Sequence, residues 1–152
     1  MKLSTRCRYA TLALFDIAFH NDGKPTQVRQ IAERQDLPAR FLEQIFQDLR
    51  RAELVDGRRG RNGGYYLHRD ASEITLADII QATDGPLDAA FGVAEVDPEQ
   101  PATDERSVSS LMWCEVASRI RDLYAEYSLE DLVQRAEDAG LQRGAPGYMY
   151  FI

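Results

Sequence analysis

Three arginines gather on one glycine-rich turn, which reads RRGRNGG at positions 58–64. The run Tyr65 to Leu67 that follows it is β-prone, because aromatic side chains favour strands. The glycines permit the tight backbone angles that a hairpin requires. A winged helix uses such a basic turn between two strands to contact the DNA backbone or a narrow minor groove. The segment therefore predicts contact with nucleic acid.

The helix expected over Pro38–Ala52 carries side chains that can read base pairs. Apolar residues recur at three- and four-residue spacing from Phe41 to Leu49 and mark a buried face. On this helix, Glu43 can accept a hydrogen bond from a cytosine amino group, and Gln44 can pair with an adenine edge. An ordinary solvated helix face would carry the same two residues, but the order of the surrounding elements favours DNA contact.

The elements before this helix are those of a helix-turn-helix. Apolar spacing predicts a first helix over residues 2–20, with Ser4 or Thr5 as its N-cap. A second, short helix is expected to begin with Thr26 as its cap and to end in a turn at residues 36–38. The third helix of such a motif enters the major groove.

The elements after it complete a winged variant of the same motif. A strand at residues 54–55, the arginine turn and a strand at residues 64–67 form the expected wing. Thr75 starts a capping-box pattern for a further helix that runs to about Ala82. The fold class predicted is mainly α with a small β-wing.

The second half of the sequence predicts a dimerisation arm. Residues 88–106 are acidic and poor in apolar side chains, so we expect a mobile loop. A long helix follows from Ser107 to Tyr127, and Ser128 caps a short one from Leu129 to Ala139. The long helix carries more apolar surface than one small chain can cover, and a second copy of the chain would bury it. Packing wholly within the monomer is the alternative. The expected domains are a DNA-binding domain at 1–87, the loop at 88–106, dimerisation helices at 107–139 and a tail at 140–152.

Charge divides the chain in the same way. Residues 1–69 hold 13 Lys and Arg against 8 Asp and Glu, a charge of +5, whereas residues 70–152 hold 5 against 17, a charge of −12. Phosphate would repel the second half, so any DNA contact is expected in the first.

Other classes of protein are not supported. The sequence shows no paired catalytic carboxylates in a known motif, no Ser/His/Asp order and no phosphate loop, so we expect no enzyme. No apolar run approaches the roughly 18 residues of a membrane span, and no secretory signal is recognised. Two cysteines are too few for a disulfide framework, which favours a reducing cytoplasm.

Three segments closely resemble the Rrf2 family of bacterial winged-helix repressors: MKLSTRCRYATLALFDIAFH, PARFLEQIFQDLRRAELV and RRGRNGGYYLHRDASEITLADIIQATDGP. The resemblance covers residues 1–87 almost continuously and residues 113–133 more loosely. It implies a homodimeric transcription factor crossed by a long C-terminal helix. It places Phe41, Glu43 and Gln44 on the recognition helix, and Arg59 and Gly60 on the wing. The candidates for phosphate contacts, which position rather than specify, are Lys2, Thr5, Arg6, Arg8, Arg40, Arg58 and Arg61.

The sensing function is less closely defined by the resemblance. Many family members bind an iron–sulfur cluster through three cysteines in the loop before the long helix, but residues 88–110 contain no cysteine and no histidine. We therefore expect no cofactor, and an iron–sulfur-sensing repressor of the same family is the alternative. In this respect the chain resembles the CymR-like members, which regulate sulfur metabolism, also lack these cysteines and end in a similar aromatic stretch. That likeness implies repression of cysteine and sulfur genes.

The same likeness implies O-acetylserine sulfhydrylase as a partner of the tail. Tyr150, Phe151 and Ile152 would then bind the enzyme, with the isoleucine carboxylate entering its active site. Packing of these side chains as an edge strand or on the dimer core is the alternative. A protein-interaction regulator that acts chiefly through this tail is a rival function of another class.

A thiol-redox switch is a further alternative within the family. Arg6 and Arg8 would lower the pKa of Cys7 and favour its thiolate, and Cys114 could take part. A structural role as small buried hydrophobic residues is the simpler interpretation of both cysteines. His20 and His68 are expected in solvent-exposed structural positions.

Overall fold

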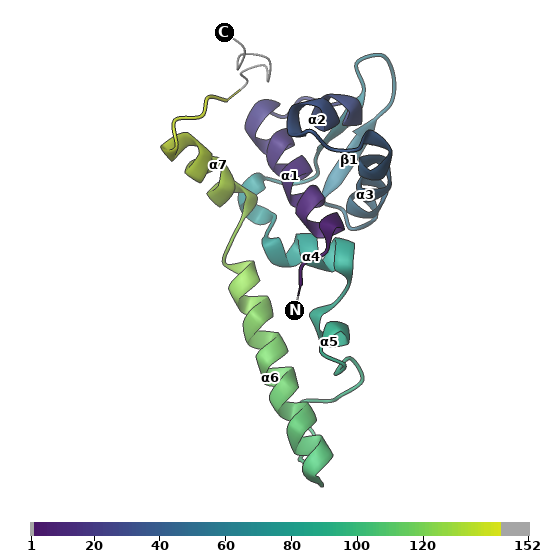
Figure 1. Cartoon of the computed structure of the whole chain (residues 1–152), viewed down its shortest axis with the longest axis vertical. Helices are drawn as coiled ribbons and strands as arrows, with labels where there is room; N and C mark the ends of the chain where they lie inside the picture. Colours follow the sequence, from purple (N-terminus) through teal and green to yellow (C-terminus); the bar gives the residue numbers. More distant parts are fainter. Residues whose placement is uncertain (1, 144–152) are drawn as a thin grey trace.

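The computed structural model describes residues 2–143 and shows a helical body from which one long helix extends (Figure 1). The helices in chain order are α1 (Thr5–His20), α2 (Val28–Gln35), α3 (Ala39–Arg51), α4 (Leu76–Asp84), α5 (Leu87–Ala90), α6 (Glu105–Ala125) and α7 (Leu129–Asp138). A hairpin of β1 (Val55–Arg58) and β2 (Gly64–Leu67) separates α3 from α4, and a 3-10 turn, η1 (Ala71–Glu73), precedes α4. The predicted order of helices, strands and wing is confirmed.

The first helix begins where the sequence predicts. Ser4 caps α1, because its hydroxyl oxygen accepts a hydrogen bond from the backbone N–H of Cys7 at 3.0 Å. The turn between α2 and α3 closes through a bond from the N–H of Leu37 to the carbonyl of Ala32 at 2.9 Å, with Asp36 in the left-handed region at a φ of 51°. These two features give α1–α3 the geometry of a helix-turn-helix.

The predicted cap of α2 is wrong. Gln27, not Thr26, precedes the first residue of the helix. The backbone of Thr26 instead pairs with Tyr65, through N–H to carbonyl bonds of 2.8 Å in both directions. The helix therefore begins at Val28, with Gln27 in the N-cap position.

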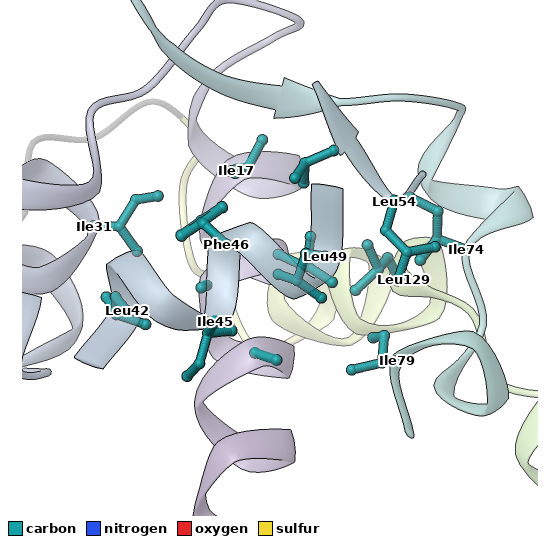
Figure 2. Close-up of a cluster of buried hydrophobic side chains, with 14 of the residues drawn as sticks. Ile17, Ile31, Leu42, Ile45, Phe46, Leu49, Leu54, Ile74, Ile79 and Leu129 are labelled. Atoms are coloured by element: carbon teal, nitrogen blue, oxygen red, sulfur yellow. The ribbon is translucent and has the colours of Figure 1, made fainter. Parts of the chain in front are cut away.

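Most elements of the body contribute to a main apolar core (Figure 2), and a smaller cluster of Phe19, Val133 and Ala136 joins α1 to α7. Figure 2 shows side chains from α1, α2, α3, α4 and α7 converging around Phe46 and Leu49, both of which are fully buried. Burying a side chain of this size contributes roughly 1.5–3 kcal/mol. The labelled members of the main core are Ile17, Ile31, Leu42, Ile45, Phe46, Leu49, Leu54, Ile74, Ile79 and Leu129.

One carboxylate is buried beside this core. Asp16 on α1 is 0% exposed and accepts hydrogen bonds from the guanidinium of Arg34, at 3.0 Å from Nε, and from Gln35 Nε2 at 2.8 Å. A buried charge is tolerated only when it is paired and hydrogen-bonded, so this network fixes the end of α2 against α1. The sequence analysis does not identify it.

The long helix starts earlier than expected. Asp104 caps α6 and accepts from the N–H of Ser107 at 2.7 Å, so the helix begins at Glu105 rather than at Ser107. The short helix α5 also lies partly within the segment expected to be a loop. The α4 helix begins at the predicted Thr75–Asp78 capping box but continues to Asp84 instead of ending near residue 82.

The last helix returns to the body. Ser128 caps α7 as predicted, and the N–H of Leu129 donates to the carbonyl of Ile74 at 2.9 Å. Leu129 joins the main core, and α7 packs against α1 and η1. In the part of the chain that the structure describes, no helix is both long and apolar enough to cross a membrane.

Candidate nucleic-acid interface

The third helix buries one face and exposes the other. Leu42, Ile45, Phe46 and Leu49 are fully buried in the core. Glu43, Gln44, Gln47 and Arg40, which the apolar spacing leaves on the opposite side, are exposed to solvent. A helix with side chains is about 10–12 Å wide and fits the major groove, so this exposed face can reach base edges. Gln47 is not among the residues predicted from the sequence, although its spacing from Glu43 and Gln44 places it on the same face.

Phe41 is less exposed than Glu43 and Gln44, which are also predicted to contact DNA from this helix. Its ring is half-buried and meets the ring of Tyr9 on α1 edge-on, with centroids 5.8 Å apart. This contact fixes the first turn of α3 against α1. Phe41 therefore orients the exposed residues that follow it.

The residues near the start of α1 that are predicted to contact phosphates divide into two groups. Lys2, Thr5 and Arg8 are exposed and remain available to a phosphate backbone. Arg6 instead forms an ion pair with Asp48 on α3. Asp48 also accepts a hydrogen bond from Arg51 Nη1 at 3.1 Å. Arg6 thus ties the two helices together, a position that the sequence pattern did not reveal because Asp48 lies on another element.

The arginine turn forms the tip of the hairpin. Arg58 is the last residue of β1, and Arg59, Gly60 and Arg61 follow in the turn; all four are exposed. The N–H of Gly63 donates to the carbonyl of Gly60 at 3.0 Å and closes it. The tip projects beyond α2 (Figure 1). Three guanidinium groups on such a loop can approach a phosphate backbone or a minor groove.

The base of the wing is anchored much more tightly than its tip. Gly64 has a φ of +148°, and a Cβ atom at this position would lie 2.2 Å from the carbonyl oxygen of Thr26. The next residue, Tyr65, pairs with Thr26 and stacks its ring on that of Phe46, with centroids 4.5 Å apart. The wing is therefore docked on both the segment before α2 and the third helix.

The environment of Cys7 differs from the expected one. The thiol is buried, and this burial raises its pKa despite a hydrogen bond with Thr83. The expectation of a pKa lowered by Arg6 and Arg8 is wrong, because Arg6 is directed to Asp48 and Arg8 lies in solvent. The structural interpretation of Cys7 agrees with this burial. Cys114 is half-buried on α6.

The two histidines lie at the end of α1 and just after β2, and His68 has the predicted solvent exposure whereas His20 does not. His68 is exposed and lies 2.8 Å from a carboxylate oxygen of Asp56 on the neighbouring strand. His20 is half-buried, which lowers its pKa. The predicted partner residues Tyr150, Phe151 and Ile152 lie outside the described residues.

Comparison with known proteins finds transcriptional regulators of one family, both by sequence and by structure. A sequence profile of the Rrf2 family, described as "Iron-dependent Transcriptional regulator", matches residues 3–135. The HTH-type transcriptional regulator IscR of Photorhabdus laumondii is 36% identical over 137 residues, which cover 90% of this chain and 82% of that protein. In structure, CymR, the global cysteine regulator of B. subtilis, matches with a TM-score of 0.69 and 31% identity over 89% of this chain and 98% of its own. IscR of T. potens also matches with a TM-score of 0.69, at 32% identity over 99% of this chain and 97% of its own.

The description of the profile names iron, but the side chains of this chain do not fit an iron site. Residues 88–110 hold no cysteine and no histidine. Within residues 2–143, no three or more His, Cys, Asp or Glu side chains gather closely enough to hold a metal ion. Cys7 is packed in the core rather than presented to a ligand.

The anchoring of the wing can be tested at Gly64. We expect Gly64→Ala to lower the free energy of unfolding by more than about 1 kcal/mol, because the substitution forces a Cβ atom against the Thr26 carbonyl at an unfavourable φ. Urea denaturation provides the measurement. Gly57→Ala is the matched control, since its Cβ would lie 3.5 Å from the nearest atom, on Tyr65, and should change stability by less than about 0.5 kcal/mol. Equal stability of both variants would contradict this account of the wing.

Proposed function

Because the chain belongs to the Rrf2 family of transcriptional regulators, we propose that it is a homodimeric repressor that binds promoter DNA in the cytoplasm. In this proposal α3 enters the major groove, and the turn at residues 58–63 lies in or beside the minor groove. Bound across a promoter, the protein would block access to it.

The observation that carries the DNA-binding proposal is the amphipathic division of α3 beside a basic wing. Glu43 and Gln44 are exposed over a fully buried apolar face, so they are presented to a groove without cost to the core. Gln44 can form paired hydrogen bonds with adenine, and Glu43 can accept from cytosine. Arg59 suits the negative potential of a narrow minor groove. The exposed residues that would hold the phosphates and set the register are Lys2, Thr5, Arg8, Arg40, Arg58 and Arg61.

Removing a base contact and removing a phosphate contact should weaken DNA binding in different ways. Gln44→Ala should weaken binding to the preferred site about 5- to 150-fold and relax the choice of base at one position, since a good base contact is worth roughly 1–3 kcal/mol. Arg61→Ala should weaken binding to all sequences and reduce the slope of log affinity against log salt by about 1. Fluorescence anisotropy on a duplex selected from a random pool, titrated at several salt concentrations, measures both.

Arg106→Ala serves as the control for that experiment, because Arg106 is exposed but lies at the start of α6 in the acidic half. Its affinity and salt slope should match those of the parent protein. If the parent protein selected no sequence and its binding did not weaken with salt, DNA regulation would not be the function.

Homodimerisation is proposed from the surface of α6. Val108, Met112 and Leu123 are 59%, 53% and 49% exposed, and helical spacing places all three on one side of the helix. Extended apolar surface of this kind marks an interaction site in proteins that are otherwise polar outside. A second copy, related by a two-fold axis, would bury the stripe and would also match the symmetry of a palindromic operator.

A charge placed in this stripe should separate the protomers. We expect Met112→Asp to convert a dimer to a monomer, because an unpaired carboxylate would be buried in the interface. Sedimentation velocity reports the change. Ser118→Asp adds the same charge to an exposed position on another side of α6 and should leave the dimer intact. If Met112→Asp remained dimeric with unchanged affinity, the proposed interface would be wrong.

The proposed target genes are those of cysteine and sulfur metabolism. The likeness to the global cysteine regulator of B. subtilis supports this assignment, as does the absence of cysteine and histidine from residues 88–110. Genomic footprinting should find occupied sites in front of cysteine-biosynthesis and sulfur-uptake genes, with increased transcription of those genes when the regulator is deleted. Occupancy confined to iron–sulfur assembly genes would favour the alternative of an iron–sulfur-sensing repressor. The proposed enzyme partner is O-acetylserine sulfhydrylase, which Tyr150, Phe151 and Ile152 would bind; the likeness to CymR-like regulators supports this proposal.

A further inference from the structure

Gln27 lies between the helix-turn-helix and the wing. It is exposed immediately before α2, and its side-chain Nε2 donates a long hydrogen bond of 3.4 Å to the backbone carbonyl of Arg61. Its own backbone N–H donates to Gln30 Oε1 at 3.2 Å, which holds Gln27 against the first turn of the helix. A residue fixed to α2 thus reaches a carbonyl in the basic turn.

This contact acts where the wing is otherwise least supported. The base is secured by the two 2.8 Å bonds between Thr26 and Tyr65. Beyond it, the turn is closed by its own bond from Gly63 to Gly60, and Gly60 has a φ of +111° and no atom within 4 Å of the place where its Cβ would be. Within residues 2–143, the side-chain hydrogen bond that we find reaching this turn from outside the hairpin is the one from Gln27.

Fixing the turn before DNA arrives has an energetic consequence. Ordering one residue of backbone costs roughly 1–2 kcal/mol, and a flexible loop must meet this cost when it binds. A turn that is already held near its bound position pays less of this ordering free energy when DNA binds. Its guanidinium groups therefore bind DNA more tightly through the same contacts.

We propose that Gln27 is a positioning residue for the wing: it holds the Arg61 carbonyl so that Arg59 and Arg61 are presented at a fixed distance from α3. The inference rests on the proposed function, since it concerns how the same interface binds duplex DNA. Gln27 acts through the wing and contributes no base contact of its own. A direct contact between Gln27 and a phosphate at the start of α2 is the competing account.

The test uses Gln27→Met, which keeps the length of the side chain and removes the amide donor. Gln134→Met is the matched control, because Gln134 is an exposed glutamine on α7 that donates to Asp138 at 3.0 Å, remote from the wing. We expect Gln27→Met to weaken binding to the selected duplex roughly two- to tenfold, which is the range for one hydrogen bond. Because the Gln27 side chain also belongs to the capping box at the start of α2, Gln27→Met should lower the melting temperature slightly. Gln134→Met should bind like the parent protein.

A double-mutant cycle separates positioning from direct contact. In a background carrying both Arg59→Ala and Arg61→Ala, the effect of Gln27→Met should fall below about twofold, because both arginines that Gln27 positions are absent. A full loss in that background would overturn the proposal in favour of direct phosphate contact. A parent protein that binds the duplex and a Gln27→Met variant that binds equally well would overturn this proposal while leaving the proposed function intact.

Hydrogen exchange on the free protein provides a measurement that does not involve DNA. Amides of residues 59–63 should exchange faster in Gln27→Met than in the parent, whereas those of Thr26 and Tyr65 should be unchanged. Identical exchange in the turn would overturn the positioning role. If the parent bound no duplex at all, the proposed function would fail as well, and this outcome is recognised from the parent alone.

Discussion

The close approach of Gly64 to the Thr26 carbonyl determines how the two proposed DNA-binding elements are spaced. A Cβ atom on residue 64 would lie 2.2 Å from that oxygen, so only glycine lets the hairpin come near enough to pair with the segment before α2. The pairing in turn brings the Tyr65 ring onto Phe46 of α3. The wing, α2 and α3 consequently form one unit, and backbone contacts set the distance between α3 and the basic turn.

Local signals in the sequence were sufficient for most of the fold. Thr75 and Ser128 are identified from the sequence as helix caps, and Ser4 is one of the two residues predicted to cap the first helix. A capping side chain bonds to a backbone N–H within three residues, so the signal lies in a few neighbouring positions. Thr26 has the same chemistry but is recruited by Tyr65, which is distant in the chain. Asp104 was missed as a cap because the acidic segment around it was expected to be a loop.

The candidate site was predictable where exposure follows helical periodicity and unpredictable where it depends on tertiary pairing. Periodicity alone places Glu43 and Gln44 outside a buried face, and the structure has them there. The ion pair of Arg6 with Asp48 and the burial of Asp16 against Arg34 each join two helices. Their partners can be assigned only when the packing of those helices is known.

The placement of charge explains how an acidic chain can still approach DNA. Its net charge is −7, but residues 1–69 carry +5 and the segment at 88–106 is strongly acidic. Figure 1 shows α6 extending away from the hairpin, and the chain that precedes α6 running alongside it. At physiological ionic strength charges are screened over about 8 Å, so a phosphate beside the wing responds mainly to the arginines there. Repulsion from the acidic arm then acts on misoriented encounters and favours approach by the basic face.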